Sequence, residues 1–263
     1  MIHALVLAAA TASPSPAATP TPNPCAGLLA EVNRPTTGYS PCAAQPRTAV
    51  LEIGYQHEWN GDSSTRDQLG QAFMRFGVAS RLELDFIGPN DLAQRGPSGD
   101  ASGFADSGLG FKYELDTTPQ WQLAVDGLYT SPSGARAFTT GNATYAVNLD
   151  ATYQLTASTS FASTLSLGSS GGFGASGAHG RYGVFMPSLL VLQQFDNSTQ
   201  AYVEYVNVSR SAPDVGDSSF FDTGIQRLAG PNLEVDVEYG HSLTGVPSQR
   251  FNYVGAGLGI LVP

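Results

Sequence analysis

The sequence of 263 residues contains one string that suggests chemistry, Gly168-Ser-Ser-Gly-Gly172, which matches the G-x-S-x-G pattern of serine hydrolases. In those enzymes the serine lies on a turn from a strand into a helix, and this turn exposes its hydroxyl. Here the string lies in the Gly- and Ser-rich run 168–177, with no helical pattern after it. The same run cannot bind phosphate, because a phosphate loop needs a following helix and a lysine. We therefore interpret the string as chance composition.

Two histidines, His57 and His241, are the remaining candidates for a hydrolytic centre, but no distinctive Ser or Asn motif stands beside either. The four histidines are scattered and the two cysteines, Cys25 and Cys42, lie close together near the N-terminus. This spacing does not suit a zinc site. The sequence thus predicts no enzyme, no cofactor and no metal site.

Charge and hydropathy exclude two further classes, nucleic-acid-binding proteins and helical membrane proteins. With 12 Lys and Arg against 22 Asp and Glu, the net charge is −10, whereas a nucleic-acid partner requires a basic surface. Only 13% of the residues are charged, about half the share usual in soluble domains. No apolar run approaches the ~18 residues of a membrane helix. Such a composition is typical of alternating β-strands with one face toward lipid and the other toward water.

Apolar and polar residues alternate along much of the chain. In segment 233–239 the odd positions are apolar, and the even positions carry Glu234, Asp236 and Glu238. Because successive side chains of a strand point to opposite faces, this pattern indicates a strand with one apolar and one acidic face. The same alternation is found in segments 51–56, 81–86, 109–115 and 147–154.

The alternating segments number twelve, and the connections between them are short and long in turn. This layout predicts the all-β class, as an antiparallel transmembrane β-barrel of about 12 strands with short periplasmic turns and long external loops. A soluble sandwich or propeller, the alternative, has no reason to alternate its loops in this way. The predicted strands cover 48–58, 70–78, 80–87, 106–115, 120–130, 143–155, 158–168, 182–194, 200–209, 218–228, 231–240 and 250–261.

Two further features fit a barrel. Aromatic residues such as Trp59, Trp121 and Tyr239 lie toward the ends of predicted strands, where amphipathic rings favour the boundary between membrane and water. The last predicted strand, 250–261, is rich in glycine on one face. These glycines are expected to place small groups where the barrel closes on itself.

If lipid covers the apolar faces, the barrel interior receives twelve carboxylates, with Arg75, Arg81 and Lys112 as counter-charges. Buried charges must be paired or hydrated. One interpretation is a hydrated, net-acidic pore that favours cations and neutral polar solutes over anions. The other is a filled barrel, in which the three basic residues hold neighbouring carboxylates in place. The lumen-lining candidates are Glu52, Arg75, Arg81, Glu83, Asp85, Lys112, Glu114, Asp126, Asp150, Glu204, Asp222, Glu234, Asp236 and Glu238, and Glu58 completes the carboxylates.

The N-terminal region is expected to precede the barrel of residues 47–263. Residues 1–12 resemble a signal peptide without its basic start, and 13–24 are a Pro-rich linker. Segment 25–46 is predicted to be a short periplasmic element. In an exported protein Cys25 and Cys42 would form a disulfide that clamps this element against the barrel mouth, unless they remain two free thiols.

Several blocks of the sequence resemble one family of bacterial outer-membrane transporters. Leu51-Glu-Ile-Gly-Tyr55, Met74-Arg-Phe-Gly-Val78, Leu128-Tyr-Thr-Ser-Pro-Ser-Gly134 and above all Gly103-Phe-Ala-Asp-Ser-Gly-Leu-Gly-Phe-Lys-Tyr113 are similar to the "MetA pathway of phenol degradation" family. The resemblance spans about residues 48–263. It implies a β-barrel and the passage of small, aromatic or hydrophobic compounds.

Together these observations predict a monomeric porin-like channel in the outer membrane of a Gram-negative bacterium, through which small molecules pass passively. The alternative is a structural or surface-binding barrel with a closed lumen. The expected partners are outer-membrane lipid, a small-molecule solute and the barrel-assembly machinery during insertion, and no nucleic acid is expected.

Overall fold

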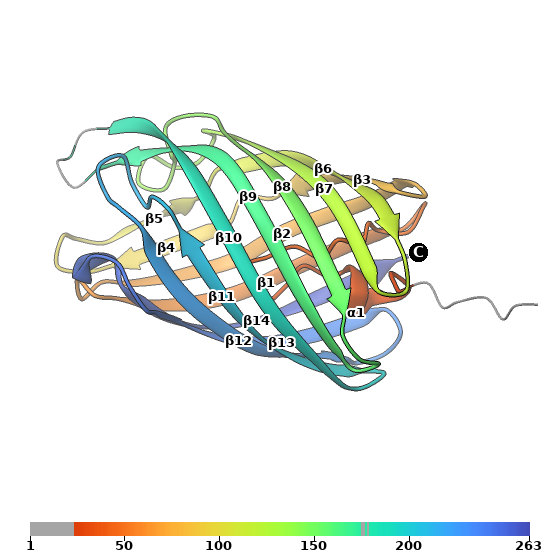
Figure 1. Ribbon diagram of the computed structural model, residues 1–263. Helices are drawn as coiled ribbons and strands as arrows, with labels where there is room; N and C mark the ends of the chain where they lie inside the picture. Colours follow the sequence, from red (N-terminus) through yellow and green to blue (C-terminus); the bar gives the residue numbers. More distant parts are fainter. Residues whose placement is uncertain (1–23, 175–176, 178) are drawn as a thin grey trace, which may run out of the picture.

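A computed structural model describes residues 24–174, 177 and 179–263 of the chain (Figure 1). The predicted signal peptide, 1–12, and the predicted linker up to residue 23 lie outside the described residues. Apart from two short helices, the described chain consists of antiparallel strands and their connections.

Twelve of the described strands form a closed barrel. Each strand pairs with its neighbours along the chain, and β1 pairs with both β2 and β14, which closes the ring. The prediction of a twelve-stranded antiparallel barrel is therefore confirmed. The elements are α1 (Leu28–Glu31), β1 (Ala49–Asn60), β2 (Thr65–Ala79), β3 (Leu82–Ile87), β4 (Asp91–Arg95), β5 (Ala101–Phe104), β6 (Ser107–Thr117), β7 (Trp121–Ser131), β8 (Thr144–Gln154), β9 (Thr159–Phe173), β10 (His179–Asp196), β11 (Thr199–Val208), β12 (Ser218–Leu228), β13 (Leu233–Ser242), the 3-10 helix η1 (Pro247–Gln249) and β14 (Phe251–Val262).

Two additional strands, β4 and β5, extend the barrel wall beyond β3 and β6. Strand β2 pairs Phe73 with Ile87 of β3 and, further along, Leu69 with Asp91 of β4, in one continuous register. Strands β4 and β5 pair with each other and continue the register of β3 and β6 in the same way. The two strands are thus the outer part of one long hairpin that is interrupted halfway.

The sequence analysis placed loops at 59–69 and 88–105, where the structure has more strand. The interruption lies at Pro89, which has no N–H for the ladder, and in β2 at Gly70 and Gln71, whose φ angles are 106° and 41°. These positions break the alternation of apolar and polar residues, and for this reason the two short strands that follow Pro89, β4 and β5, were not predicted.

The side chains of the barrel are arranged inside out relative to a soluble protein. Apolar residues such as Leu109, Leu167 and Val237 are exposed on the outer face, whereas Glu52 and Asp150 of the inner face are fully buried. Outward apolar and inward polar side chains are the pattern of an outer-membrane barrel. Among the described helices, none is long and apolar enough to cross a membrane.

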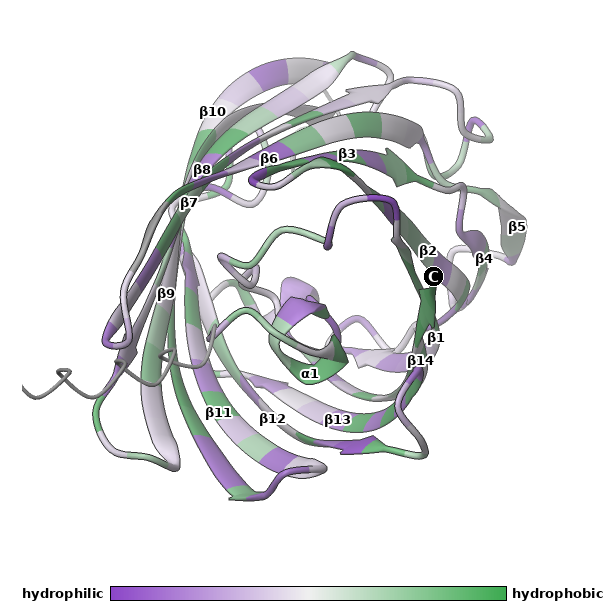
Figure 2. Ribbon diagram, turned by 90° about the vertical axis from the view of Figure 1, so that its right-hand side faces the viewer, coloured by the Kyte–Doolittle hydropathy of each residue, from purple (hydrophilic) through white to green (hydrophobic). Residues whose placement is uncertain are grey.

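The two ends of the barrel differ. Short turns at 80–81, 118–120 and 197–198 lie at the end where β14 finishes, which is the periplasmic end in barrels of this kind. The longer connections, among them 132–143 and 209–217, lie at the opposite, outer end. A view along the barrel shows α1 and the chain around it inside the ring of strands (Figure 2). The expectation that this segment rests against the barrel mouth was therefore wrong.

Candidate channel lumen and internal plug

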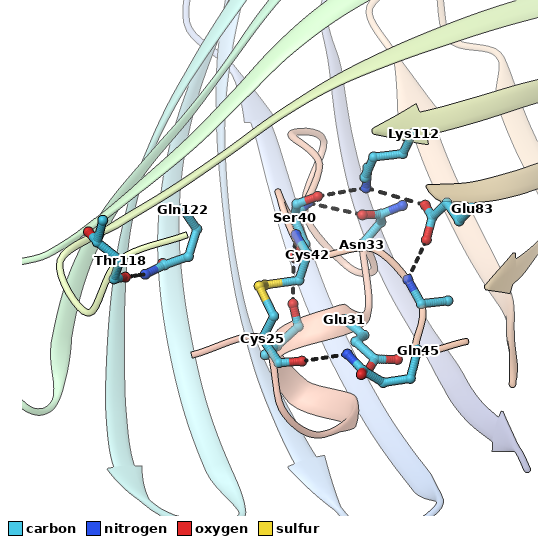
Figure 3. The surroundings of a disulfide bond; sticks show 12 residues. Cys25, Glu31, Asn33, Ser40, Cys42, Gln45, Glu83, Lys112, Thr118 and Gln122 are labelled. Carbon is cyan, nitrogen blue, oxygen red and sulfur yellow. Dashed lines mark hydrogen bonds and ion pairs between the residues drawn. A yellow bond between two sulfur atoms is a disulfide. The ribbon is translucent and has the colours of Figure 1, made fainter. Parts of the chain in front are cut away.

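Residues 24–48 form a plug inside the barrel. A disulfide with an S–S distance of 1.99 Å joins Cys25 to Cys42 and closes this segment into a loop (Figure 3). The side chains of Leu28 and Val32 are buried with Val50 of β1 in a small apolar cluster. Apolar packing therefore attaches the start of the plug to the periplasmic part of the barrel wall.

Carboxylates of the wall accept hydrogen bonds from the backbone of the plug. Glu52 of β1 accepts the N–H groups of Asn33, at 3.0 Å, and Arg34, at 2.7 Å. On β11, Glu204 accepts the N–H of Thr37 at 2.8 Å and that of the following residue at 2.9 Å. Hydrogen bonds to an ionised carboxylate are about twice as strong as neutral ones. Part of the acidic lining thus holds the plug in place.

Arg75 of β2 connects the plug to two wall carboxylates. It is fully buried, and its guanidinium lies 2.9 Å from Glu83 and 3.3 Å from Glu52. The same guanidinium donates to the plug carbonyls of Glu31 and Cys42, the latter at 2.8 Å. A buried cation needs partners of this kind because its desolvation is costly. Arg75 therefore makes the barrel wall and the plug one electrostatic unit.

Lys112 of β6 makes a second connection of this type (Figure 3). Its Nζ donates to the carbonyl of Ser40 at 2.6 Å and lies 3.6 Å from Glu83. The second oxygen of Glu83 accepts the N–H of Ala44 at 2.6 Å. Nζ also lies 5.8 Å from the centre of the Tyr39 ring, within the range of a cation–π contact.

Arg34 is the cation that the plug itself supplies to the lumen. Its Nη2 lies 3.2 Å from Asp236 and 3.6 Å from Glu238 of β13. A Cβ added at Gly257 would lie 2.2 Å from Nε of Arg34, and one at Gly54 would lie 2.4 Å from its Cζ. The glycine face of the last strand therefore makes room for Arg34. Burial alone would lower the pKa of its guanidinium, but the nearby carboxylates of Asp236 and Glu238 raise this pKa above its ordinary value.

Glu31, at the end of α1, is a buried acid of the plug. Burial raises its pKa to about 7, and this rise is partly offset by the positive charge of Arg75. Among the described residues its Oε2 has no hydrogen-bond partner. This carboxyl group changes its charge near neutral pH, at the point where the plug meets the wall.

The structure places the fourteen predicted lumen-lining residues as follows. Arg81 was predicted wrongly: it lies exposed in the turn between β2 and β3 and donates to the carbonyl of Leu115. The alternation had been extended one step beyond Leu82, where β3 begins. The other thirteen are buried on the inner face, and they are Glu52, Arg75, Glu83, Asp85, Lys112, Glu114, Asp126, Asp150, Glu204, Asp222, Glu234, Asp236 and Glu238.

Two cavities flank the plug. One, on its outer side, has a volume of about 390 Å³ and is lined by Arg34, Phe220 and Tyr253 among others. The other, of about 330 Å³, lies between the plug and the periplasmic part of β7 to β12. Thr36 lines both cavities. Sequence reasoning predicted a disulfide-closed element at 25–46 but missed Thr36 and the position of the segment inside the barrel, since nothing in the segment predicts which carboxylates would bind its backbone.

The histidines considered for catalysis lie on the outer surface. His57 contacts Asp67 at 2.7 Å, and His241 contacts Asn252 at 2.5 Å. Neither contact includes a serine, so the candidate hydrolytic arrangement is not assembled. Within the described part of the chain, no group of three or more His, Cys, Asp or Glu side chains could hold a metal ion.

Solved structures similar to this one are outer-membrane channels. The COG4313 outer membrane channel from Pseudomonas putida F1 superposes with a TM-score of 0.62 at 15% identity, covering 83% of this chain and 97% of its own. For the NanC porin the values are 0.58, 11%, 80% and 98%, and for the KdgM porin 0.50, 13%, 80% and 98%. At these identities the likeness shows the barrel fold.

A search against curated protein sequences finds no match. By contrast, residues 32–260 match the family described as "Putative MetA-pathway of phenol degradation". The matched range begins within the plug and includes all the barrel strands except the last residues of β14. The chain therefore belongs to this family.

Proposed function

We propose that the protein is an outer-membrane channel through which small molecules pass a plug formed by its own N-terminal segment. The observation that carries this proposal is the pair of cavities, of about 390 and 330 Å³, that meet at Thr36 on the two sides of the plug. Volumes of this size accommodate small organic molecules. A barrel that merely needed filling would not require space on both sides of the plug.

The outer cavity presents aromatic rings to aromatic or hydrophobic solutes, beside the charged side chains of Arg34, Glu58, Arg66 and Glu238. The rings of Phe220 and Phe251 lie 5.3 Å apart in an edge-to-face arrangement, and Tyr253 stacks on Phe251 at 6.0 Å. All three rings line the outer cavity. Aromatic walls bind apolar and aromatic surfaces through dispersion and edge-to-face contacts. The family description, which refers to phenol degradation, agrees with such a solute.

The lumen as a whole is net acidic. Among the described residues, the twelve buried wall carboxylates outnumber the buried wall cations Arg75 and Lys112, the partly exposed Arg66 and the plug residue Arg34. An acidic lining repels anions. Some of these carboxylates bond to the plug and are not free to bind a passing cation. We therefore expect the lining to exclude anions more than it attracts cations.

A structural barrel with a closed lumen is the second candidate, because the plug bonds to several strands. Single-channel recording of the full chain in planar bilayers distinguishes the two functions. A channel gives discrete conductance steps and lets vesicles swell in small neutral solutes. A closed barrel gives neither, although heat-modifiability on gels shows it to be folded.

A further inference from the structure

We infer that the periplasmic cavity is an uncharged vestibule that selects neutral solutes bearing hydrogen-bonding groups on an apolar frame. This inference rests on the proposed channel function and adds the class of solute and the side of the lumen along which it leaves. Among the described residues that line this cavity, none is Asp, Glu, Lys, Arg or His. In a lumen with twelve buried wall carboxylates, this is a marked local exception.

The vestibule wall is built from three adjacent strands. Thr152 of β8, Ala162 of β9 and Leu190 of β10 pair in one row, and all three line the cavity. The row nearer the periplasm consists of Gln154, Ser160 and Leu192. We call these six residues the uncharged wall.

Amides and hydroxyls are the polar groups of the vestibule. Ser160 donates to Gln154 at 3.1 Å, and Gln200 donates to Gln226 at 2.7 Å near the rim. On the plug side the cavity is bordered by leucines, among them Leu28. A neutral solute can exchange its water for such groups and for apolar contact at little cost, since each lost hydrogen bond is replaced.

This lining disfavours the entry of ions. An ion that enters a confined space without counter-charges loses hydration that amides and hydroxyls replace only in part. The carboxylate nearest the uncharged wall is Asp150, one row further in, but it is fully buried and accepts a hydrogen bond from Thr164 at 2.7 Å. Thr164 itself lines the cavity, whereas Asp150 does not.

The link between the two cavities is Thr36. Its Oγ1 lies 2.8 and 2.7 Å from the carbonyl oxygens of Asn33 and Gly38 within the plug, and its one hydroxyl hydrogen can be donated to either. In the route that we infer, a solute passes from the outer cavity to the vestibule beside this residue, because it lines both cavities. Charged side chains, among them Glu58 and Glu238, thus line the cavity on the outer side of Thr36, and the uncharged wall lines the cavity on its periplasmic side.

Charge substitutions on the uncharged wall test the inference in the full chain. Vesicle swelling would be measured with glucose, gluconate and, at about pH 6, glucosamine, three probes of similar size and different charge. In the wild type, glucose should enter faster than both ions. Ala162→Lys should raise gluconate entry relative to glucosamine about fivefold, and Ala162→Glu should do the reverse, since a confined charge acts at short range.

Matched control variants distinguish an effect of charge on the solute route from an effect on folding. Ala162→Gln adds bulk without charge and should leave the ratio of the two ions unchanged. Gln194→Lys, at the exposed rim, repeats the charge test where folding is not at risk. Glu234→Gln, at a fully buried carboxylate that does not line the vestibule, should change the ion ratio less than Ala162→Lys does.

The opposite pattern contradicts the inference. If both charged variants at position 162 and Gln194→Lys leave the ion ratio unchanged while Glu234→Gln alters it, the solute travels along the acidic side. Equal entry of the three probes into wild-type vesicles would also overturn the vestibule, with the channel itself intact. Exclusion of all three probes would instead contradict the proposed channel function, and the vestibule with it.

Discussion

The plug faces two unlike sides of one barrel. Toward β2, β3 and β6 it meets Arg75, Glu83 and Lys112, each of which bonds to its backbone. Toward the periplasmic part of β8 to β10 it meets the uncharged wall across a cavity of about 330 Å³. Both surfaces are polar strand faces with the same alternation. On the first side charged groups attach the plug, whereas on the second side a cavity separates much of the plug from the wall.

This comparison explains why a net-acidic composition alone describes the lumen poorly. The carboxylate of Glu52 accepts two N–H groups of the plug, and that of Asp236 binds Arg34. Charges engaged in this way have little freedom to interact with a passing ion. In the proposed channel, we therefore expect the route to follow the part of the wall where such contacts are missing.

The largest expected effect follows from removing the cation that joins the wall to the plug. Arg75→Met leaves Glu52 and Glu83 buried without their partner, and it should destabilise the docked plug by about 3–5 kcal/mol. Amide hydrogen exchange over residues 31–44 would measure this loss. On the other side, Ser160→Ala should alter exchange by less than about 0.5 kcal/mol. Equal effects of the two substitutions would remove the distinction between the two sides.

The disulfide of the plug allows its contribution to be compared with that of the wall contacts. Replacing Cys25 and Cys42 together by serine frees the loop that the bond closes, and it should cost the plug roughly 3 kcal/mol in the chain-entropy model. Limited proteolysis would detect an exposed plug, while heat-modifiability would report on the barrel. A plug that resists protease as well as the wild type does would mean that the wall contacts alone hold it.

A pH dependence of the attachment is expected from Glu31. Its pKa in the folded protein, about 7, is above the ordinary value of 4.5, so the folded state holds a proton that the unfolded state has lost. The resulting stabilisation is complete below about pH 4.5 and is lost as the pH rises through 7, at a cost of about 1–3 kcal/mol. Glu31→Gln should abolish this loss.

Hydrogen exchange of α1 at about pH 5 and pH 8 would check the effect of Glu31, with wild type and variant compared at each pH. In the wild type, α1 should exchange faster at the higher pH than the change in intrinsic rate explains. The variant should show only the intrinsic change. If the exchange rate of α1 rises beyond the intrinsic change equally in wild type and variant, the pH dependence belongs to another group.

The barrel could be predicted from sequence because its signal is local and repeated. Segment 233–239 alternates without interruption, and the structure has its acidic residues buried and Val237 exposed. Where the alternation stops, prediction stopped as well. Arg81 lies in a turn just outside β3, and the strands β4 and β5, which follow Pro89, are too short for a periodic signal.

The plug could not be predicted for a different reason. Its contacts join residues far apart in the chain, such as Thr37 with Glu204, and use backbone groups that every residue possesses. One signal did exist. The glycines of β14 were interpreted as a place where the barrel closes, whereas Gly257 leaves room for the guanidinium of Arg34. A strand with a row of inward-facing glycines, together with an arginine in a segment outside the barrel strands, therefore indicates that this segment lies inside the barrel.

The most direct test of the central claim is the single-channel conductance of the full chain compared with that of a chain lacking residues 25–46. With the plug in place, we expect small, discrete steps with weak preference between cations and anions. Without it, the freed carboxylates line an open lumen, so the steps should grow several-fold and become cation-selective. Equal conductance and equal selectivity in the two proteins would contradict a passage shaped by the plug.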